Sequence, residues 1–309
     1  MSRIAVIGSI NTDLVVRSPE IPMPGQTLIG HSFTTTGGGK GANQAVAAAR
    51  LGGQVSLIAR VGDDSFGKIS LENFRKENID IENVRIDKQA PSGVALIVVD
   101  DRGENTIVVV PGANGELNEE DIKQAEPAIG NSAIALFQLE VPMKTILAGM
   151  KVAKMHQRLI ILNPAPAMPL PEEIFKYIDL IIPNQTEALT LTNVAVTDTI
   201  TAQLACDVLH GKGVSTIIIT MAEQGAYISS STYNGLVAGF NAGATVDTVA
   251  AGDTFCGGLA IAIAEGKKLN EAVRFANAAA ALSVTNAGAQ ASIPDRKTVA
   301  DFLSSRLDA

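Results

Sequence analysis

The sequence predicts an α/β fold: a doubly wound, mostly parallel central sheet with helices on both faces. Short runs of apolar, largely β-branched residues alternate with segments of helical periodicity along the 309-residue chain. Because the runs are apolar almost throughout, they are typical of central strands that are buried on both faces in a parallel sheet. Their alternation with helices indicates right-handed crossovers between parallel strands.

The expected elements follow one another along the whole chain. Strands are expected at residues 4–8, 55–59, 134–138, 159–163, 178–184 and 216–220. Helical periodicity marks residues 42–52, 68–79, 145–155 and 201–213. The last helix should end at Gly211 and Gly213, because glycine is common just beyond helix C-termini. No fixed-period repeat and no linker between halves is visible, so residues 1–309 are expected to form a single domain.

Two segments break this rhythm. Residues 12–36 have three prolines, several β-formers and no helical period, and residues 93–110 have two β runs around the polar turn DDRGEN. We therefore expect a small antiparallel sheet, built from about 12–36 and 92–111. Its outer apolar face needs cover, which suggests a lid over a cleft or a dimer contact; the alternative is an ordinary edge sheet.

Composition restricts the partners and the location. The net charge is −8 and no basic stripe is present, so we expect no nucleic-acid partner. No secretory signal is evident, and the longest apolar runs fall short of the ~18 residues of a membrane-spanning helix, so no membrane association is expected. The two cysteines, Cys206 and Cys256, lie far apart without metal-ligand spacing, which fits a reduced cytoplasmic enzyme.

The stretch GGGKGANQAVAAA, residues 37–49, is similar to a phosphate-binding loop that leads into a helix. The Walker A pattern fails, because Gly41 replaces the hydroxyl residue and Thr34 stands where the first glycine belongs. The spacing also fits a dinucleotide fingerprint, but the next strand ends in Arg60 rather than in an acidic ribose ligand. A nicotinamide-dependent oxidoreductase is therefore only weakly supported.

The polar residues around this stretch favour a polyol site. Glycines let a backbone approach a ligand closely, and Lys40 and Asn43 place polar groups beside it. Asn11 and Asp13 follow the first strand. Such paired donors and acceptors can bind vicinal hydroxyls and reject analogues that leave them unpaired. The alternative is that Asn11 and Asp13 are turn formers and that Lys40 is solvated.

A second constellation lies at DTVAAGDTFCGGLAIAIAEG, residues 247–266. Small residues precede Asp253 at the start of an apolar helix, so the free N–H groups of 250–253 can form an anion hole. Because a carboxylate repels an anion, Asp253 is expected to act as a general base during phosphoryl transfer. The alternative is a helix N-cap, although capping alone does not require the glycines at 257–258.

Five motifs together resemble the ribokinase (PfkB) family of sugar kinases. They are GSINTD, GGGKGANQAVAAARLG, NPAPA, PNQTE and DTVAAGDTFCGG, in the family's order, and the resemblance runs from about residue 3 to about residue 303. Within the family, GKGANQAVAAAR, LNPAPA and the AAGD form are most similar to members that phosphorylate ribose. The resemblance implies ATP-dependent phosphorylation of D-ribose at the 5-hydroxyl, with Mg²⁺ required, K⁺ as an activator, and a homodimer through the β lid.

The resemblance also implies site residues. The sugar should lie against Asn11, Asp13, Gly39, Lys40, Asn43 and Glu140, with Asp253 as the base. ATP should contact Asn184, the turn from Thr220 to Gly225, Gly252 and Asn277, while Glu187 organises magnesium and phosphate through water. The cation site should comprise Asp247, Val249, Ser283, Asn286, Gly288 and Ser292, mostly through carbonyl oxygens. Ala222 departs from the pattern, since the family usually has glycine there.

Other functions stay open at this point. A kinase of the same family could act on deoxyribose, a nucleoside or a keto-sugar acid, and a non-catalytic sugar sensor could retain the fold. Asn11 favours a substrate with a polar group at the 2-position, because a buried amide that faces a CH₂ group is left unpaired.

Overall fold

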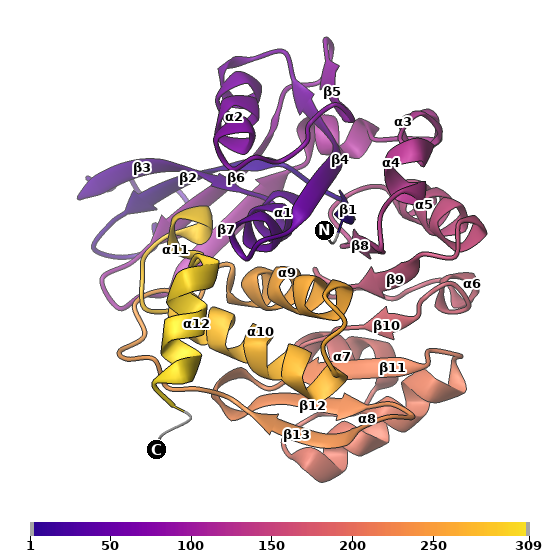
Figure 1. The fold of residues 1–309 in the computed structure, drawn as a ribbon. Coiled ribbons are helices and arrows are strands. Elements are labelled where there is room, and N and C mark those ends of the chain that lie inside the picture. The colour runs from indigo at the N-terminus through magenta and orange to yellow at the C-terminus, as the bar shows by residue number, and fades with distance from the viewer. Residues whose placement is uncertain (1–2, 307–309) are drawn as a thin grey trace.

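The computed structural model describes residues 3–306, which form a large sheet covered by helices and a smaller sheet beside it (Figure 1). In the large sheet the strand order is β13-β12-β11-β10-β9-β8-β1-β4-β5. Its strands are β1 Arg3–Ile7, β4 Gln54–Gly62, β5 Val84–Asp87, β8 Ile134–Phe137, β9 Leu159–Leu162, β10 Leu180–Ile181, β11 Thr216–Thr220, β12 Gly225–Ser229 and β13 Asn234–Ala238. The pairs from β5 to β11 are parallel, and β12 and β13 add an antiparallel edge.

The predicted strands and helices are all present. The four predicted helices are α1 Lys40–Arg50, α2 Ser65–Lys76, α5 Met143–Met155 and α8 Thr199–Gly211. Gly213 follows α8 with a φ of +101°, a left-handed conformation that glycine adopts without strain. The other helices are α3 Glu119–Gln124, α4 Glu126–Gly130, α6 Glu172–Phe175, α7 Gln185–Thr192, α9 Ala251–Ala264, α10 Leu269–Ser283, α11 Ala289–Ser292 and α12 Arg296–Ser304. Two 3₁₀ turns, η1 Gly112–Glu116 and η2 Ala222–Gln224, complete the fold.

The large sheet is buried on both faces, as its apolar strands predict. Along β1, Ile4 and Val6 join the apolar cluster that includes α1, α9 and α10. The alternate residues Ala5 and Ile7 join the opposite cluster, which includes α5 and α8. This alternation follows from the two-residue period of a strand. Within residues 3–306, none of the helices combines the length and apolar character that a membrane crossing needs.

The smaller sheet corrects one expectation. Its order is β3-β2-β6-β7, with β2 Asn11–Arg17, β3 Ser32–Gly38, β6 Gly93–Val99 and β7 Asn105–Val110. The β2–β3 and β6–β7 pairs are antiparallel as predicted, but β2 and β6 are parallel. The chain passes through α1, β4, α2 and β5 between β3 and β6, and such a long connection permits parallel pairing. The sheet is therefore mixed.

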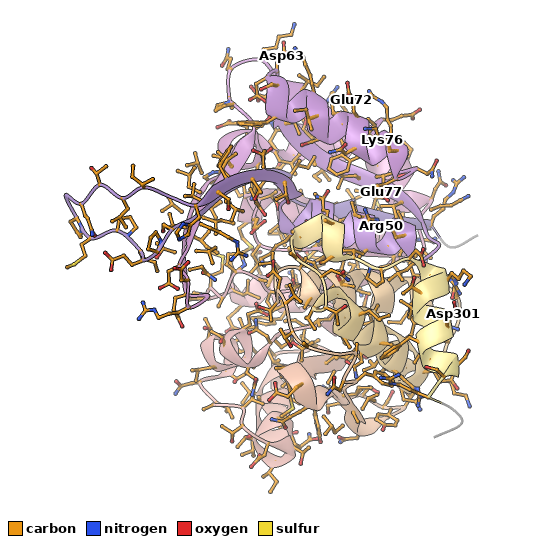
Figure 2. All side chains as sticks on the ribbon, turned by 90° about the vertical axis from the view of Figure 1, so that its left-hand side faces the viewer. Arg50, Asp63, Glu72, Lys76, Glu77 and Asp301 are labelled. Carbon is orange, nitrogen blue, oxygen red and sulfur yellow. The ribbon has the colours of Figure 1, made fainter. Side chains whose placement is uncertain are left out.

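The smaller sheet extends to one side of the body, as Figure 1 shows. Its strands arise from the segments 12–36 and 92–111 to within a few residues. One face carries the exposed apolar side chains of Phe33, Leu96, Val108 and Val110, which we call the outer face. In the body of the molecule, a salt bridge of 2.6 Å between Arg50 and Glu77 ties the end of α1 to the end of α2 (Figure 2).

Candidate active site

A cleft of about 640 Å³ lies between the smaller sheet and the carboxyl ends of the large sheet's strands. Its polar lining comes from loops that follow the strands: Asn11 after β1, Glu140 after β8, Asn163 after β9 and Asn184 after β10. In open α/β sheets this is the edge where ligands bind. The inner face of the smaller sheet supplies the opposite wall through residues such as Val15, Ile97 and Val109.

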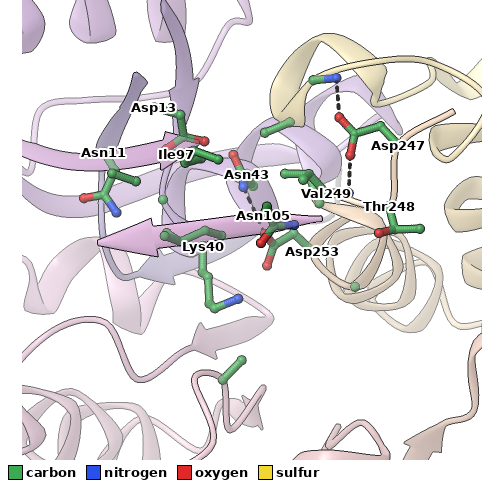
Figure 3. Close-up of a pocket in the computed structure, with 18 of the residues that line it drawn as sticks. Asn11, Asp13, Lys40, Asn43, Ile97, Asn105, Asp247, Thr248, Val249 and Asp253 are labelled. Carbon is green, nitrogen blue, oxygen red and sulfur yellow. Dashed lines mark hydrogen bonds between the residues drawn. The ribbon is translucent and has the colours of Figure 1, made fainter. Parts of the chain in front are cut away.

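The residues expected to bind sugar lie together in this cleft. Asn11, Asp13, Gly39, Lys40, Asn43, Glu140 and Asp253 all line it (Figure 3). Asn43 Nδ2 donates a hydrogen bond of 3.0 Å to Asp253 Oδ2, so residues 210 positions apart in the chain are in direct contact. Asn43 Oδ1 is buried and has no hydrogen-bond partner among the described residues. Since buried polar atoms are normally paired, this acceptor is available to a ligand hydroxyl.

The N-terminus of α1 is not a phosphate site. The N–H of Lys40 donates to Glu140 Oε2 at 2.9 Å, and the N–H of Gly41 donates to Ser9 Oγ at 3.3 Å. The next N–H, of Ala42, donates to the Ser9 carbonyl at 2.8 Å. Because a protein carboxylate and the Ser9 loop already occupy these amides, the stretch GGGKGANQA only resembles a phosphate loop.

The glycines at the start of α1 also allow close backbone packing. A Cβ at Gly41 would lie 2.5 Å from the Ser9 nitrogen, so the helix crosses directly over the loop after β1. Gly39 lines the cleft with a φ of +87°, and a Cβ there would lie 2.6 Å from the Asn11 nitrogen. Larger residues at either position would push α1 away from Asn11.

Asp253 does not cap α9, so that alternative is wrong. The helix begins at Ala251, and its N-cap is Ala250, which has a φ of 62° and makes no side-chain capping bond. Asp253 is 6% exposed, and its carboxylate instead accepts bonds from Asn43 and Gln44. The N–H groups of Ala250, Gly252 and Asp253 find no acceptor among the described residues, whereas that of Ala251 contacts the Thr248 carbonyl at 3.3 Å. Three of the four amides in the range 250–253 are thus free to receive an anion.

The glycine at 257 has a packing role rather than a role in the anion hole. A Cβ at Gly257 would lie 2.6 Å from Ala47 Cβ and 2.8 Å from the Ala48 nitrogen. Glycine therefore lets α9 approach α1 closely. This contact brings Asp253 within hydrogen-bond reach of two consecutive α1 side chains.

Three carboxylates surround the one lysine in this part of the cleft. Burial alone lowers the pKa of Lys40, but Asp253, Glu140 and Glu187 outweigh it and raise that pKa. Burial raises the pKa of Asp13 to about 6, with further contributions from Glu140 and Asp253. Burial also raises the pKa of Glu187, and the Asn184 N–H and Lys40 oppose this shift in part. Lys40 therefore stays cationic, and its ammonium group can also contact an anionic ligand in the cleft.

The expected nucleotide residues divide into two groups. Asn184, Glu187, Thr220 and Gly252 line the cleft. Asn184 caps α7, where it accepts from the Glu187 N–H at 2.8 Å while its own N–H donates to Glu187 Oε2 at 2.8 Å. This reciprocal pair fixes the Glu187 carboxylate at the edge of the cleft.

Gly225 and Asn277 lie outside the cleft lining and support β13. Asn277 Nδ2 donates to the carbonyls of Val237 and Ala238 at 3.0 and 3.1 Å. Gly225 has a φ of +108°, and a Cβ there would lie 2.2 Å from the Val237 oxygen. Nearby, Ala222 has a φ of 49°, a left-handed conformation that glycine adopts more readily than alanine.

The chemistry of the donors fits a magnesium ion that arrives with phosphates. Within residues 3–306, no three His, Cys, Asp or Glu side chains are placed to hold a metal by themselves. Magnesium commonly keeps several waters and is held by one or two carboxylates plus substrate phosphates. Glu187 is a buried carboxylate of this kind at the cleft edge.

Of the expected cation residues, Asp247, Val249 and Gly288 line the cleft, in two loops that the Asp247 carboxylate joins, whereas Ser283 ends α10 and Ser292 ends α11. Asp247 accepts from the Val249 N–H at 3.0 Å and from the Gly288 N–H at 2.9 Å (Figure 3). Ser283 and Ser292 are buried, and each donates its hydroxyl to a carbonyl three residues earlier, whereas Asn286 is exposed. The expected donors are mostly carbonyl oxygens, a ligand type that suits an alkali cation.

Sequence reasoning missed several residues of this site. Ser9 donates to Glu140 Oε2 at 2.5 Å, and Asn114 of η1 donates to Asn11 Oδ1 at 2.8 Å. Gln44 and Asn163 extend the contacts of Asp253. Gln44 carried a readable signal, because it follows Asn43 as the second of two adjacent amides in the otherwise small and apolar run ANQAVAAA.

Comparisons with known proteins identify the family of this chain. The family described as pfkB family carbohydrate kinase matches residues 1–296. The ribokinase of Haemophilus influenzae is 44% identical over 300 residues, covering 97% of this chain and 98% of the relative, and that of Bacillus subtilis is 40% identical with 98% and 100% coverage. The solved structure of Arabidopsis thaliana ribokinase complexed with ribose and ATP is 32% identical, with a TM-score of 0.90 and coverage of 98% and 99%. The chain therefore belongs to the pfkB family of carbohydrate kinases.

Proposed function

We propose that this protein transfers the terminal phosphoryl group of ATP to the 5-hydroxyl of D-ribose, giving D-ribose 5-phosphate and ADP. The observation that carries the proposal is the position of Asp253, whose carboxylate contacts Asn43 in the cleft while the amides of Gly252 and Asp253 lack acceptors. A base beside a small anion hole is the arrangement that phosphoryl transfer to an alcohol needs. The related ribokinases support ribose as the substrate.

The amide directions support a polyhydroxylated substrate. Asn114 Nδ2 donates to Asn11 Oδ1 at 2.8 Å, and Asn114 Oδ1 accepts from the Ile10 N–H at 2.8 Å. Asn114 therefore fixes the orientation of the Asn11 amide. The Asn11 oxygen accepts the bond from Asn114, and the Asn11 NH₂ group is left to donate to a ligand. A donor of this kind favours ribose over deoxyribose, because a CH₂ group at the 2-position would leave it unpaired. The carboxylate of Asp13 and Oδ1 of Asn43 supply acceptors for sugar hydroxyls.

The proposed chemistry assigns a task to each charged group. Asp253 accepts the proton of the 5-hydroxyl as the hydroxyl oxygen bonds to phosphorus and the bond from phosphorus to ADP breaks. The amides of Gly252 and Asp253, together with Lys40, stabilise the negative charge on the transferring group. Bound magnesium neutralises phosphate charge, and Glu187 is the residue that would hold it through water. Gly225 and Asn277 would influence ATP binding indirectly, because they support β13 and do not line the cleft.

Potassium activation is part of the proposal. Asp247 joins the loop of Val249 to the loop of Gly288, and both loops border the cleft beside the start of α9. Carbonyl oxygens of the proposed cation residues would hold the ion. Because the two loops meet next to the free amides, a cation there orders the anion hole rather than contacting the sugar.

The smaller sheet is proposed to act as a lid on a single kinase domain and as a dimer contact. Its inner face lines the cleft, so closing it excludes water that could accept the phosphoryl group. Its outer face exposes apolar side chains that a second copy of the chain can cover, giving a homodimer. Sedimentation of a Leu96→Glu, Val108→Glu variant should give a monomer, whereas an unchanged mass would refute the contact.

A substrate panel with coupled ADP detection tests the function. We expect ribose to be used with the highest kcat/KM, deoxyribose to be used poorly, and activity to rise with K⁺. Equal use of ribose and deoxyribose would contradict the proposed specificity. Phosphorylation of nucleosides alone would indicate that the protein is a nucleoside kinase of the same family. A nucleoside kinase of Methanocaldococcus jannaschii has the same fold with a TM-score of 0.84, but at 20% identity it supports the fold alone. Absence of ADP formation with every sugar would favour a sugar sensor.

A cytoplasmic location completes the proposal. Both cysteines are buried free thiols, which is typical of proteins from a reducing compartment. Fractionation of cells that express the full-length protein, followed by immunoblotting, would test this location directly.

A further inference from the structure

Helix α1 buries a complete amide side chain directly behind the cleft. Gln44 is 0% exposed and lies among the buried alanines of α1. A buried amide is costly unless its donors and acceptor are all paired. Gln44 meets this condition, since its Nε2 donates to Asp253 Oδ1 at 2.9 Å and to Asn163 Oδ1 at 3.1 Å, while its Oε1 accepts from Gln138 Nε2 at 2.7 Å.

The neighbours leave Gln44 only one amide orientation. The carboxylate of Asp253 can only accept, so it must face the NH₂ group of Gln44. Asn163 Nδ2 donates to the Ile182 carbonyl at 3.0 Å, which leaves Asn163 Oδ1 to face the same NH₂ group. Gln138 then completes the set from the far side. The side chain is held at three points by groups of fixed direction.

The two oxygens of Asp253 are held differently. Oδ2 contacts Asn43, which lines the cleft and has a free acceptor for the sugar. Oδ1 contacts Gln44, which does not line the cleft. A bound sugar therefore competes for Asn43 but leaves the bond from Gln44 in place. Gln44 thus holds Oδ1 from the protein interior, while Oδ2 lies on the side of the cleft where the substrate would bind.

We propose that Gln44 is a positioning residue for the reaction: it fixes the Asp253 carboxylate so that Oδ2 faces the sugar hydroxyl. This inference rests on the proposed role of Asp253 as the base. Without the bond from Gln44 the carboxylate can rotate, and a misplacement of about 1 Å at a reacting group can cost about 100-fold in rate. Gln44 itself does not reach the substrate, so its loss affects turnover more than sugar affinity.

The experiment compares Gln44→Met with Gln138→Met in the full-length protein. Methionine keeps the length of glutamine without its amide. Gln44→Met is expected to lower kcat by about 10- to 100-fold, as is typical when a partner that orients a functional group is lost. The KM and the calorimetric Kd for ribose should change by less than about threefold, because the contacts in the cleft remain. Gln138→Met removes a member of the same buried chain but leaves both bonds from Gln44 Nε2 intact, so its kcat per folded molecule should stay within about threefold of wild type.

Gln44→Glu is the second variant and keeps the proposal testable if methionine prevents folding. When protonated, the new carboxyl can donate to Asp253 Oδ1; when ionised, it repels that carboxylate. Its kcat relative to wild type should therefore fall as pH rises, a trend that a merely structural role does not produce. A flat ratio across pH would contradict the inference.

The Asp253→Asn variant separates failure of this inference from failure of the proposed function. If Asp253→Asn is nearly inactive while folded Gln44→Met keeps kcat within about threefold of wild type, the inference about Gln44 alone is overturned. If Asp253→Asn itself retains near-normal turnover, the proposed base is wrong. Equal losses of kcat in Gln44→Met and Gln138→Met would indicate a general packing effect and overturn the positioning role.

Discussion

We predict that the charged Asp13 carboxylate lowers the stability of the ligand-free protein at neutral pH, although it contributes to sugar binding. The residue is 8% exposed on the inner face of the smaller sheet, and its carboxylate makes no hydrogen bond to the described residues (Figure 3). Burial first, and then Glu140 and Asp253, raise its pKa from 3.8 to about 6. A raised acid pKa means that the stability contribution is fully present below pH 3.8 and is lost as pH rises through about 6. The shift corresponds to about 3 kcal/mol of unfolding free energy.

Asp13→Asn removes this loss, because the amide has nearly the same shape and cannot ionise. The variant should be more stable than wild type by about 3 kcal/mol at pH 8 and by less than about 1 kcal/mol at pH 4. Urea unfolding of both proteins at the two pH values, without ligand, measures these differences. Equal stability at pH 8, or the same difference at both pH values, would refute the reasoning about the buried charge.

The same variant should bind ribose poorly. A carboxylate that accepts sugar hydroxyls contributes about 1.5–3 kcal/mol, so its replacement should weaken binding about 10- to 150-fold at pH 8. For wild type, ribose affinity should fall below pH 6, as Asp13 becomes protonated. Isothermal titration calorimetry measures both effects. Unchanged affinity in Asp13→Asn would remove the residue from the sugar site.

Three further predictions concern other groups of the cleft. Ala250→Gly should stabilise the protein by about 0.5–1 kcal/mol in urea unfolding, because it relieves the left-handed N-cap of α9 by more than the added chain entropy costs; destabilisation would argue against strain there. Lys40→Met should lower kcat/KM about 100-fold or more in the coupled ADP assay, since three carboxylates lose their shared cation and the transferring group loses a positive charge; a loss below about tenfold would contradict that role. Asp247→Ala should abolish the rise of activity with KCl at constant ionic strength, because the two loops separate, whereas a normal K⁺ response would place the cation elsewhere.

The sequence predicted the body of the fold well because its strands carry the signal by themselves. The runs IAVIG and TIIIT are mainly apolar, and the structure buries the isoleucines and valine of both in the large sheet. The strand predicted at 178–184 is reduced to β10, Leu180–Ile181, since Pro183 follows it and Asn184 already caps α7. The parallel β2–β6 pair could not be predicted, because pairing between distant strands depends on the path of the intervening chain.

The candidate site was predicted where short motifs carry reactive side chains. Asn11, Asn43 and Asp253 meet as the motifs suggested. Local sequence patterns could not predict which acceptor each backbone N–H group contacts. Glu140 closes the N-terminus of α1 from 100 residues away, and no local pattern indicates that. The packing role of the glycines could not be predicted for the same reason, since their neighbours are residues distant in the sequence.

The most direct test of the account is a single-turnover measurement on Asp253→Asn with ribose and ATP. Removing a general base should slow phosphoryl transfer about 10²- to 10⁴-fold. Ribose should still bind within about tenfold of wild type, since Asn43 has a free amide oxygen and can turn to suit the new side chain. Phosphoryl transfer at a rate near that of wild type would contradict the claim that this carboxylate takes the proton from the sugar.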